Sequence, residues 1–212
     1  MHLPLFPLGT VLFPGMLLPL HVFEQRYRAL VRRCLSEDRP FGVTLIRSGS
    51  EVGPPADPHR VGTTARIVHA EGLPDGRFEI LARGEQRFAI DALVTSDEPY
   101  LVGDIRHLDE VGGEGVAELA QRVPALFSEY LLARAATAGG PLSAPSASSP
   151  LELSYLVAAN LAIDLTEQQQ LLELPSAAAR LEAEVRLIER EVGLLKDLLV
   201  RQNARGAGPR QN

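Results

Sequence analysis

Residues 1–23 read MHLPLFPLGTVLFPGMLLPLHVF and contain no formally charged side chain. By length and hydropathy, this stretch is similar to a transmembrane helix or a signal peptide. Its prolines argue against both, because a proline inside a helix costs about 3 kcal/mol. No basic region and no A-x-A-like cleavage site accompany it. The stretch therefore predicts short buried strands with proline-bounded turns, at Leu3–Phe6, Val11–Phe13 and Leu17–Pro19.

The composition of the 212 residues is that of a globular protein, with 45% hydrophobic and 23% charged residues, which excludes global disorder. Cys34 is the only cysteine, so an internal disulfide and a multi-cysteine metal site are excluded. A single thiol also fits the reducing cytoplasm. The net charge of −6 argues against binding to nucleic acid or anionic membranes. We expect a soluble cytoplasmic protein that does not bind a membrane.

The first half of the chain predicts one short helix and several strands. The helix is expected at Val22–Leu35, because Phe23, Tyr27, Leu30 and Cys34 recur on one face. Residues 61–92 are expected to form an antiparallel meander with a tight connection at Gly84-Glu85, and the several short strands predict a small barrel or a curled sheet. Their expected ranges are Phe41–Ile46, Gly62–His69, Arg77–Arg83, Arg87–Leu93 and Tyr100–His107.

After residue 115 the hydrophobic period changes from 2 to 3.6, which predicts helices for the rest of the chain. The last helix, about Ser176–Asn203, carries apolar residues at heptad spacing. This stripe predicts either packing on the helical core of the same chain or self-association through the C-terminal helix. The predicted fold class is α+β, with a β-barrel subdomain at 1–110, a helical bundle at 114–203 and a disordered tail at 204–212.

Motifs for common catalytic chemistry are absent from the sequence. Lys196 is the only lysine and lies in no G-x-x-x-x-G-K-[ST] loop, so this way of holding ATP phosphates is excluded. The histidines lack metal-ligand spacing, and no G-x-S-x-G elbow occurs. Cys34, on the apolar face of its helix, is interpreted as a buried structural thiol. The sequence therefore predicts no catalytic residue, no metal and no cofactor.

Several segments together resemble the substrate-binding N-terminal domain of Lon proteases. Leu3–Leu8, Val11–Gly15, Leu18–Leu20 and Phe23–Tyr27 are similar to the family pattern PLFPL…VLFPG…LPL.IFE.RY. Val61-Gly62-Thr63, Leu73–Phe78 and Gly84–Phe88 resemble later family segments, and Leu153-Ser154-Tyr155, Gln169–Glu173 and Arg180-Leu181 resemble its helical half. Gln168 stands where the family has lysine. The resemblance covers about residues 1–200 and implies a PUA-like pseudo-barrel followed by a helical bundle.

This resemblance implies a non-catalytic protein that binds polypeptides. In the parent proteases the domain is associated with substrate recognition, whereas the ATPase and Ser–Lys proteolytic modules follow it; neither has a matching motif here. We therefore expect an adaptor in protein quality control, with unfolded or apolar polypeptide and an ATP-dependent protease as its partners. The cereblon branch of the family is excluded, since its ligand domain needs zinc-binding cysteines and tryptophan, and this chain has no tryptophan.

The turn around residues 13–17 is the candidate binding surface. It is unusually apolar for a loop, so Phe13, Met16 and Leu17 are expected either to form an exposed patch or to close the barrel core. Glu24, Gln25 and Arg26 are candidates for its polar rim.

Two other classes of function stay open at this level. The first is an RNA- or nucleotide-binding module, since PUA-like barrels also bind RNA; the scarcity of aromatic residues, 5%, counts against stacked bases. The second is an enzyme with a small-molecule site in a cleft that one sequence cannot show.

Overall fold

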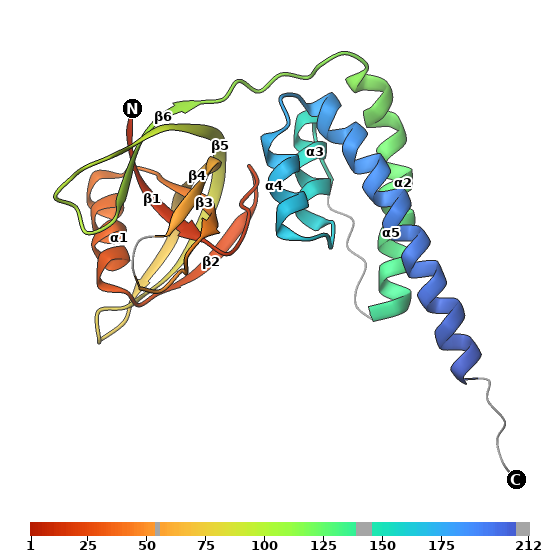
Figure 1. Cartoon of the computed structure of the whole chain (residues 1–212), viewed down its shortest axis with the longest axis horizontal. Coiled ribbons are helices and arrows are strands. Elements are labelled where there is room, and N and C mark those ends of the chain that lie inside the picture. Colours follow the sequence, from red (N-terminus) through yellow and green to blue (C-terminus); the bar gives the residue numbers. More distant parts are fainter. Residues whose placement is uncertain (54–55, 139–145, 207–212) are drawn as a thin grey trace, which may run out of the picture. The chain divides into compact units, whose positions relative to one another are not determined.

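The computed structural model describes residues 1–53, 56–138 and 146–206, with side chains described to residue 201. The chain divides into two compact units (Figure 1). The first comprises Met1–Glu110 and Ala158–Glu173, and the second comprises Val111–Val157 and the residues from Leu174 onward. Residues 207–212, most of the expected tail, lie outside the described residues, whereas residues 204–206 continue the last helix.

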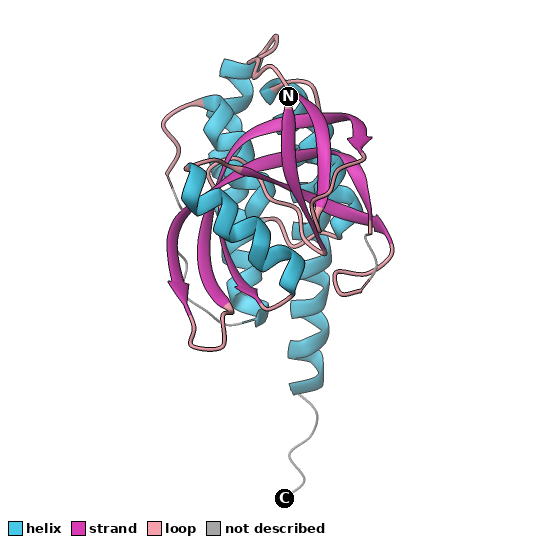
Figure 2. Cartoon of the chain, turned by 90° about the vertical axis from the view of Figure 1, so that its left-hand side faces the viewer, coloured by secondary structure: helices cyan, strands magenta, loops and turns pink. Residues whose placement is uncertain are grey.

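Among the described residues, six strands of the first unit form one mixed sheet in the order β2-β5-β4-β3-β1-β6. Figure 2 shows the strands in magenta. An additional pairing of β5 with β6 closes the sheet into a barrel, and β2 lies outside this ring because it pairs with β5 alone among the described strands. β1 and β3 are parallel, and the other pairs are antiparallel. The strands are β1 (His2–Leu8), β2 (Leu17–Val22), β3 (Phe41–Ser48), β4 (Asp57–Gly72), β5 (Phe78–Val94) and β6 (Leu101–His107).

A small apolar cluster fills the closed part of the barrel. Leu3, Leu5, Phe88, Ile90 and Ile105 form it, and each is at most 5% exposed. Gly62 lets the strands approach around this cluster, because a Cβ there would lie 2.9 Å from the Phe88 ring and 2.4 Å from a backbone oxygen of β3. A larger side chain at residue 62 therefore has no room.

A second and larger core lies around helix α1 (Gln25–Glu37). Tyr27, Leu30, Val31 and Cys34 are buried on one face of this helix, at the spacing that the sequence shows. They pack in one cluster with β1, β3 and the first half of β5. α1 ends at Asp38, which adopts the left-handed conformation with φ 47° and donates its N–H to the Cys34 carbonyl oxygen.

Helix α4 (Leu165–Glu173) belongs to the first unit, although the sequence groups it with the helical half. The buried Arg87 guanidinium of β5 donates to the Leu172 carbonyl oxygen at 2.8 Å and forms an ion pair with Glu110 at 3.0 Å. Gln169 donates to the Val61 carbonyl oxygen at 3.0 Å. Main-chain acceptors of α4 and β4 thus satisfy buried polar side chains, and these bonds fasten α4 to the barrel.

The second unit is built on the parallel pair of helices α2 (Val116–Ala138) and α5 (Ala177–Gly206). Arg122 pairs with Glu189 at 3.0 Å and Glu129 pairs with Lys196 at 2.7 Å. Each ion pair joins residues 67 positions apart, so the two helices run in the same direction. The first residues of α3 (Pro150–Asn160) join this unit, where the buried Arg180 donates to Ser154 Oγ at 2.8 Å.

One short helix, α1, lies among the strands, only helices follow β6 within the described elements, and the C-terminal helix is long, as the sequence predicts. Three local predictions are wrong. Residues 11–13 form no strand; they are a buried loop in which the Leu12 carbonyl oxygen accepts a hydrogen bond from Thr63 Oγ1 at 2.5 Å. β5 passes through Gly84-Glu85 without a turn, because a register shift against β4 absorbs the irregularity. α1 begins at Gln25, so Phe23 precedes it.

Candidate functional site

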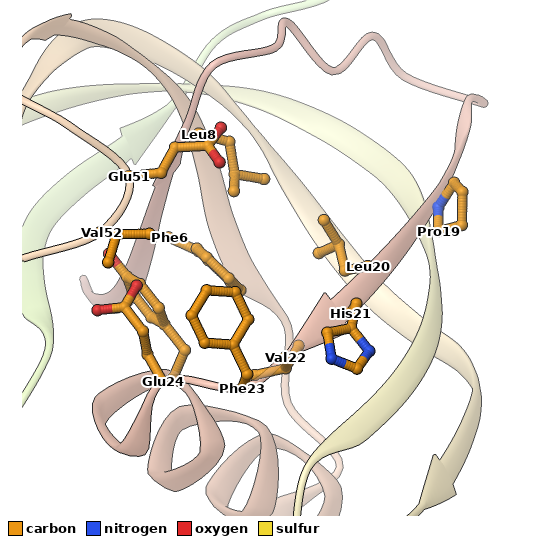
Figure 3. A pocket seen from close by; sticks show the side chains of 11 residues that line it. Phe6, Leu8, Pro19, Leu20, His21, Val22, Phe23, Glu24, Glu51 and Val52 are labelled. Atoms are coloured by element: carbon orange, nitrogen blue, oxygen red, sulfur yellow. The ribbon is translucent and has the colours of Figure 1, made fainter.

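A groove of about 210 Å³ opens on the first unit beside β2, and Figure 3 shows its side chains. β1, β2, the start of α1 and the loop after β3 all contribute to it. We call it the β2 groove, and it is lined by Phe6, Leu8, Pro19, Leu20, His21, Val22, Phe23, Glu24, Tyr27, Glu51 and Val52.

The floor of the β2 groove is aromatic. The Phe6 and Tyr27 rings stack with their centroids 3.9 Å apart, and both residues are buried. Burial also raises the pKa of the Tyr27 hydroxyl, so this group stays neutral. The floor therefore offers a preformed apolar surface rather than a reactive group.

Two large apolar side chains on the rim are exposed. Phe23 is 49% exposed and Val52 is 54% exposed. Phe23 precedes the N-cap residue Glu24, the position from which an apolar residue often packs on the fourth helical residue. Arg28 occupies that fourth position, so α1 offers Phe23 no apolar partner there. Figure 3 shows the Phe23 ring standing over the groove near Phe6.

Arg26 connects the parts of the rim to one another. Its guanidinium pairs with the Glu24 carboxylate at 3.1 Å and donates to the Glu51 carbonyl oxygen at 2.9 Å. It also lies 4.5 Å from the centroid of the Tyr27 ring. The Glu51 carboxylate accepts a hydrogen bond from the Gly9 N–H. These contacts hold the loop after β3 against α1 and the end of β1, which preorganises the groove.

The groove lining is apolar with a negative margin. Glu24 and Glu51 are its only formally charged residues at pH 7, and no lysine or arginine lines it. His21 Nδ1 lies 2.5 Å from Glu79 Oε1, and its Nε2 lies 3.3 Å from Arg77 Nη1. Apolar contact is therefore the main interaction that the lining provides.

The structure separates the six residues that the sequence proposes as a binding surface. The prediction that Phe13 belongs to an exposed patch is wrong, because this residue is only 1% exposed. At Phe13 the alternative holds, and the turn closes the core. Met16 packs partly buried against the core around α1, and Leu17 is 47% exposed on β2. Glu24 lines the groove, Arg26 supports its rim, and Gln25 is exposed at the start of α1 outside the lining.

Sequence reasoning missed most of the groove. The sequence predicts Phe23 on the buried face of the first helix, and the floor residues Phe6 and Leu8 belong to a strand whose pattern indicates only a core. The missing signal for Phe23 was available, since an arginine at the fourth helical position leaves an apolar residue before the N-cap without a partner. No pattern in the sequence indicates Val52 in its polar loop.

The part of the chain that the structure describes contains neither a reactive cysteine nor a metal site. Burial raises the pKa of the Cys34 thiol to about 11, which keeps it protonated and unreactive. Within residues 1–53, 56–138 and 146–201, no group of three potential ligands could hold a metal ion. None of the described helices combines the length and the hydropathy needed to cross a bilayer.

Comparison with known proteins gives a consistent result. The model of the "ATP-dependent protease La (LON) substrate-binding domain" matches residues 2–190. Lon protease from Anaeromyxobacter dehalogenans is 34% identical in an alignment of 206 positions that covers 92% of this chain and 24% of that protein. Lon protease 2 from Myxococcus xanthus is 32% identical, with 92% and 24% covered. This chain thus spans about a quarter of the length of these relatives.

Two solved structures share the fold. The Lon N-terminal domain protein from Xanthomonas campestris is 29% identical, with a TM-score of 0.61 over 86% of this chain and 95% of that one. The N-terminal domain of the Mycobacterium avium complex Lon protease is 18% identical, with a TM-score of 0.69 over 89% and 98% of the two chains. These structures confirm the α+β fold class. Since the family model covers most of the residues, the chain belongs to the Lon substrate-binding domain family.

Proposed function

We propose that this Lon-like substrate-binding domain binds unfolded or apolar polypeptide segments in the β2 groove and performs no catalysis itself. One observation supports this most directly: Phe23 and Val52 are both about half exposed beside a preformed aromatic floor. Exposed apolar surface next to a groove is typical of protein interaction sites. A role as a cytoplasmic adaptor in quality control, presenting substrates to an ATP-dependent protease, extends this proposal from the family's role.

The alternative of RNA binding is not favoured. Single-stranded nucleic acid is held by positive grooves with aromatic platforms. The β2 groove has an aromatic residue on its rim, but its charged lining residues are Glu24 and Glu51, which repel phosphates. Apolar polypeptide meets no such repulsion.

Fluorescence anisotropy tests the proposal with a labelled polypeptide that cannot fold, such as a reduced and carboxymethylated protein. The unmodified domain is expected to bind it with a saturable curve. The double variant Phe23→Ser/Val52→Ser is expected to weaken binding at least tenfold. Both sites are exposed, so its free energy of unfolding should fall by no more than about 1 kcal/mol.

Leu93→Ser is the matched control, because Leu93 is 44% exposed on β5 and lies outside the groove. It should leave the affinity unchanged. Met16→Ser/Leu17→Ser tests the surface expected from the sequence. Equal binding by the unmodified domain and the Phe23→Ser/Val52→Ser variant would refute the β2 groove as the site, and no binding by either would refute the proposed function.

Self-association through α5 is a second proposed property. Leu194 and Leu198, 53% and 48% exposed, form one face of α5, with Glu191 and Arg201 at its two ends. In an antiparallel pair of α5 helices centred at residue 196, Leu194 of one copy meets Leu198 of the other. Glu191, which pairs with Arg190 at 2.8 Å within its own helix, then also meets Arg201, so the face is complementary to itself in charge.

Sedimentation velocity over a hundredfold range of concentration measures this association. A monomer–dimer equilibrium is expected for the unmodified chain and its loss for Leu194→Ser/Leu198→Ser. Val200→Ser is the control on another face of the same helix, since Val200 is 68% exposed. A monomer at every concentration would show that this face has no second copy as its partner.

A further inference from the structure

We propose that the β2 groove takes its polypeptide as an added β-strand along the free edge of β2, and that the preferred segment carries a lysine or arginine beside an apolar residue. This inference rests on the proposed function and specifies how the substrate is recognised.

The first argument is the direction of the main-chain groups of β2. The Gly84 N–H of β5 donates to the Met16 carbonyl oxygen at 2.9 Å. Because the main-chain groups of a strand point alternately to its two edges, residues 18, 20 and 22 face β5. Pro19, which has no N–H, then faces away from β5, where a proline in a strand does not weaken the ladder. Within the described residues no strand pairs with that side.

The free edge can therefore hold a second strand. Leu17 and His21 each present an N–H and a carbonyl group there, and Pro19 presents a carbonyl group. The two donors are four residues apart, which is about 13 Å in a strand, so the occupant needs at least five extended residues. Addition of a strand to an exposed sheet edge is a common mode of peptide recognition, in which the main chain gives affinity without a sequence requirement.

The second argument is the position of the edge. Pro19–Phe23 line the groove over five consecutive residues, so the same strand forms the edge and a wall of the groove (Figure 3). A segment paired with β2 turns every second side chain to one face. An apolar side chain on that face can reach Phe23 and Val52, which are exposed without it.

The third argument is charge. Glu24 is compensated by Arg26 at 3.1 Å, whereas Glu51 forms no ion pair within the described residues; its carboxylate accepts only the Gly9 N–H. No cation lines the groove. A lysine or arginine of the segment supplies the missing charge, and an aspartate or glutamate at the same position is repelled.

A scan with N-methylated peptides tests the added strand. The probe is a labelled ten-residue peptide with the central sequence Leu-Lys-Val-Phe-Val, N-methylated at one central residue at a time. In an added strand only every second N–H faces β2, and loss of one hydrogen bond of about 1 kcal/mol lowers affinity about fivefold. The affinities are therefore expected to alternate along the peptide, with the intervening N-methyl groups changing them less than twofold. Equal effects at all positions would overturn the added strand.

Replacing the lysine of the probe by glutamate tests the charge. The lysine peptide is expected to bind about threefold more tightly at low salt, as for an exposed ion pair. Glu51→Gln should abolish this difference, and the control Asp91→Asn, an exposed carboxylate on β5 outside the groove, should preserve it. A difference that survives Glu51→Gln would overturn the assignment of the charge preference to Glu51.

These results separate the inference from the proposed function. If the carboxymethylated protein binds but the probe peptide does not bind, or shows no alternation, the added strand is refuted and polypeptide binding stands. If neither binds, the proposed function fails with it.

Discussion

Glu184 of α5 has a buried carboxylate that lacks hydrogen-bond partners within the described residues. The residue is 0% exposed, and neither carboxylate oxygen has a hydrogen-bond partner within the described residues. This desolvation raises the pKa of Glu184 well above 4.5, although the Arg180 charge lowers it in part. The folded state therefore binds this proton more tightly than the unfolded state does. Its stabilising contribution is complete below the ordinary pKa near 4.5 and is lost as the pH rises through the raised pKa.

Glu184→Gln should stabilise the second unit at neutral pH. The amide keeps the shape and removes the charge, so we expect the free energy of unfolding at pH 7.5 to increase by about 1–3 kcal/mol. Near pH 4.5 the gain should be small. Urea unfolding between these pH values measures the difference. Glu182→Gln is the control, because the Glu182 side chain is 66% exposed and its ion-pair partner Arg186 is exposed as well. A constant difference at all pH values would contradict the raised pKa.

The sequence predicts the apolar stripe of α5 but not the burial of Glu184. Leu181, Val185 and Ile188 are buried as their spacing indicates. Glu184 lies beside them on the helix surface, at the border that a two-helix contact leaves open to water. The first residues of α3 also pack in this unit, and the buried face of α5 is wider there than the apolar stripe alone shows. A packing partner that is distant in sequence leaves no periodic signal.

At the scale of the elements, the C-terminus of α1 is a place where the backbone is strained. Asp38 has φ 47° and ψ 48°, a left-handed conformation that glycine adopts without steric cost. Its side chain is 96% exposed, so the contact with Arg66 contributes little. Asp38→Gly is expected to stabilise the first unit by about 0.5–1 kcal/mol, and Asp38→Val to destabilise it, because a β-branched residue fits this conformation worst.

Equilibrium unfolding in urea, followed by far-UV circular dichroism, orders the variants. The expected order of stability is glycine, then aspartate, then valine. If the Arg66 contact dominated instead, both variants would be less stable than the unmodified chain, and Arg66→Ala would reproduce the loss.

Helices and strands are predicted correctly where they depend on a local pattern of apolar and turn residues. They are predicted wrongly where they depend on pairing with a strand that is distant in sequence. The helices and most strands follow from hydrophobic period and turn residues alone. The path of β5 through Gly84 does not, because a glycine inside a strand and a glycine in a turn look alike until the partner strand is known. The same holds for the groove: Glu24 and Arg26 were found near α1, but β1 and the loop after β3 contribute from distant parts of the chain.

At the scale of the molecule, the first stretch of the first unit ends at Glu110, where the sequence places the end of the barrel subdomain, but this unit also includes part of the expected helical bundle. Residues 158–173 lie with the strands, so the first unit is made of two separate stretches of chain. We propose that the two separate stretches of chain that make up each unit unfold together, so that the cooperative unit is not a continuous segment of sequence. Leu172 of α4 and Leu181 of α5 are nine positions apart and both at most 1% exposed, yet they belong to different units.

Leu172→Ala and Leu181→Ala test this division as a matched pair. Each removes the same atoms from a fully buried site and should cost about 2–5 kcal/mol. Hydrogen exchange measured by mass spectrometry should show Leu172→Ala loosening the amides of β4 and β5, because α4 is bound to these strands through Arg87 and Gln169, and a cavity at residue 172 weakens the packing that positions α4. Leu181→Ala should loosen α2 and α5 and leave β4 and β5 protected. If Leu172→Ala loosened α2 and α5 instead, the helical half would be one cooperative unit, as the sequence alone suggests.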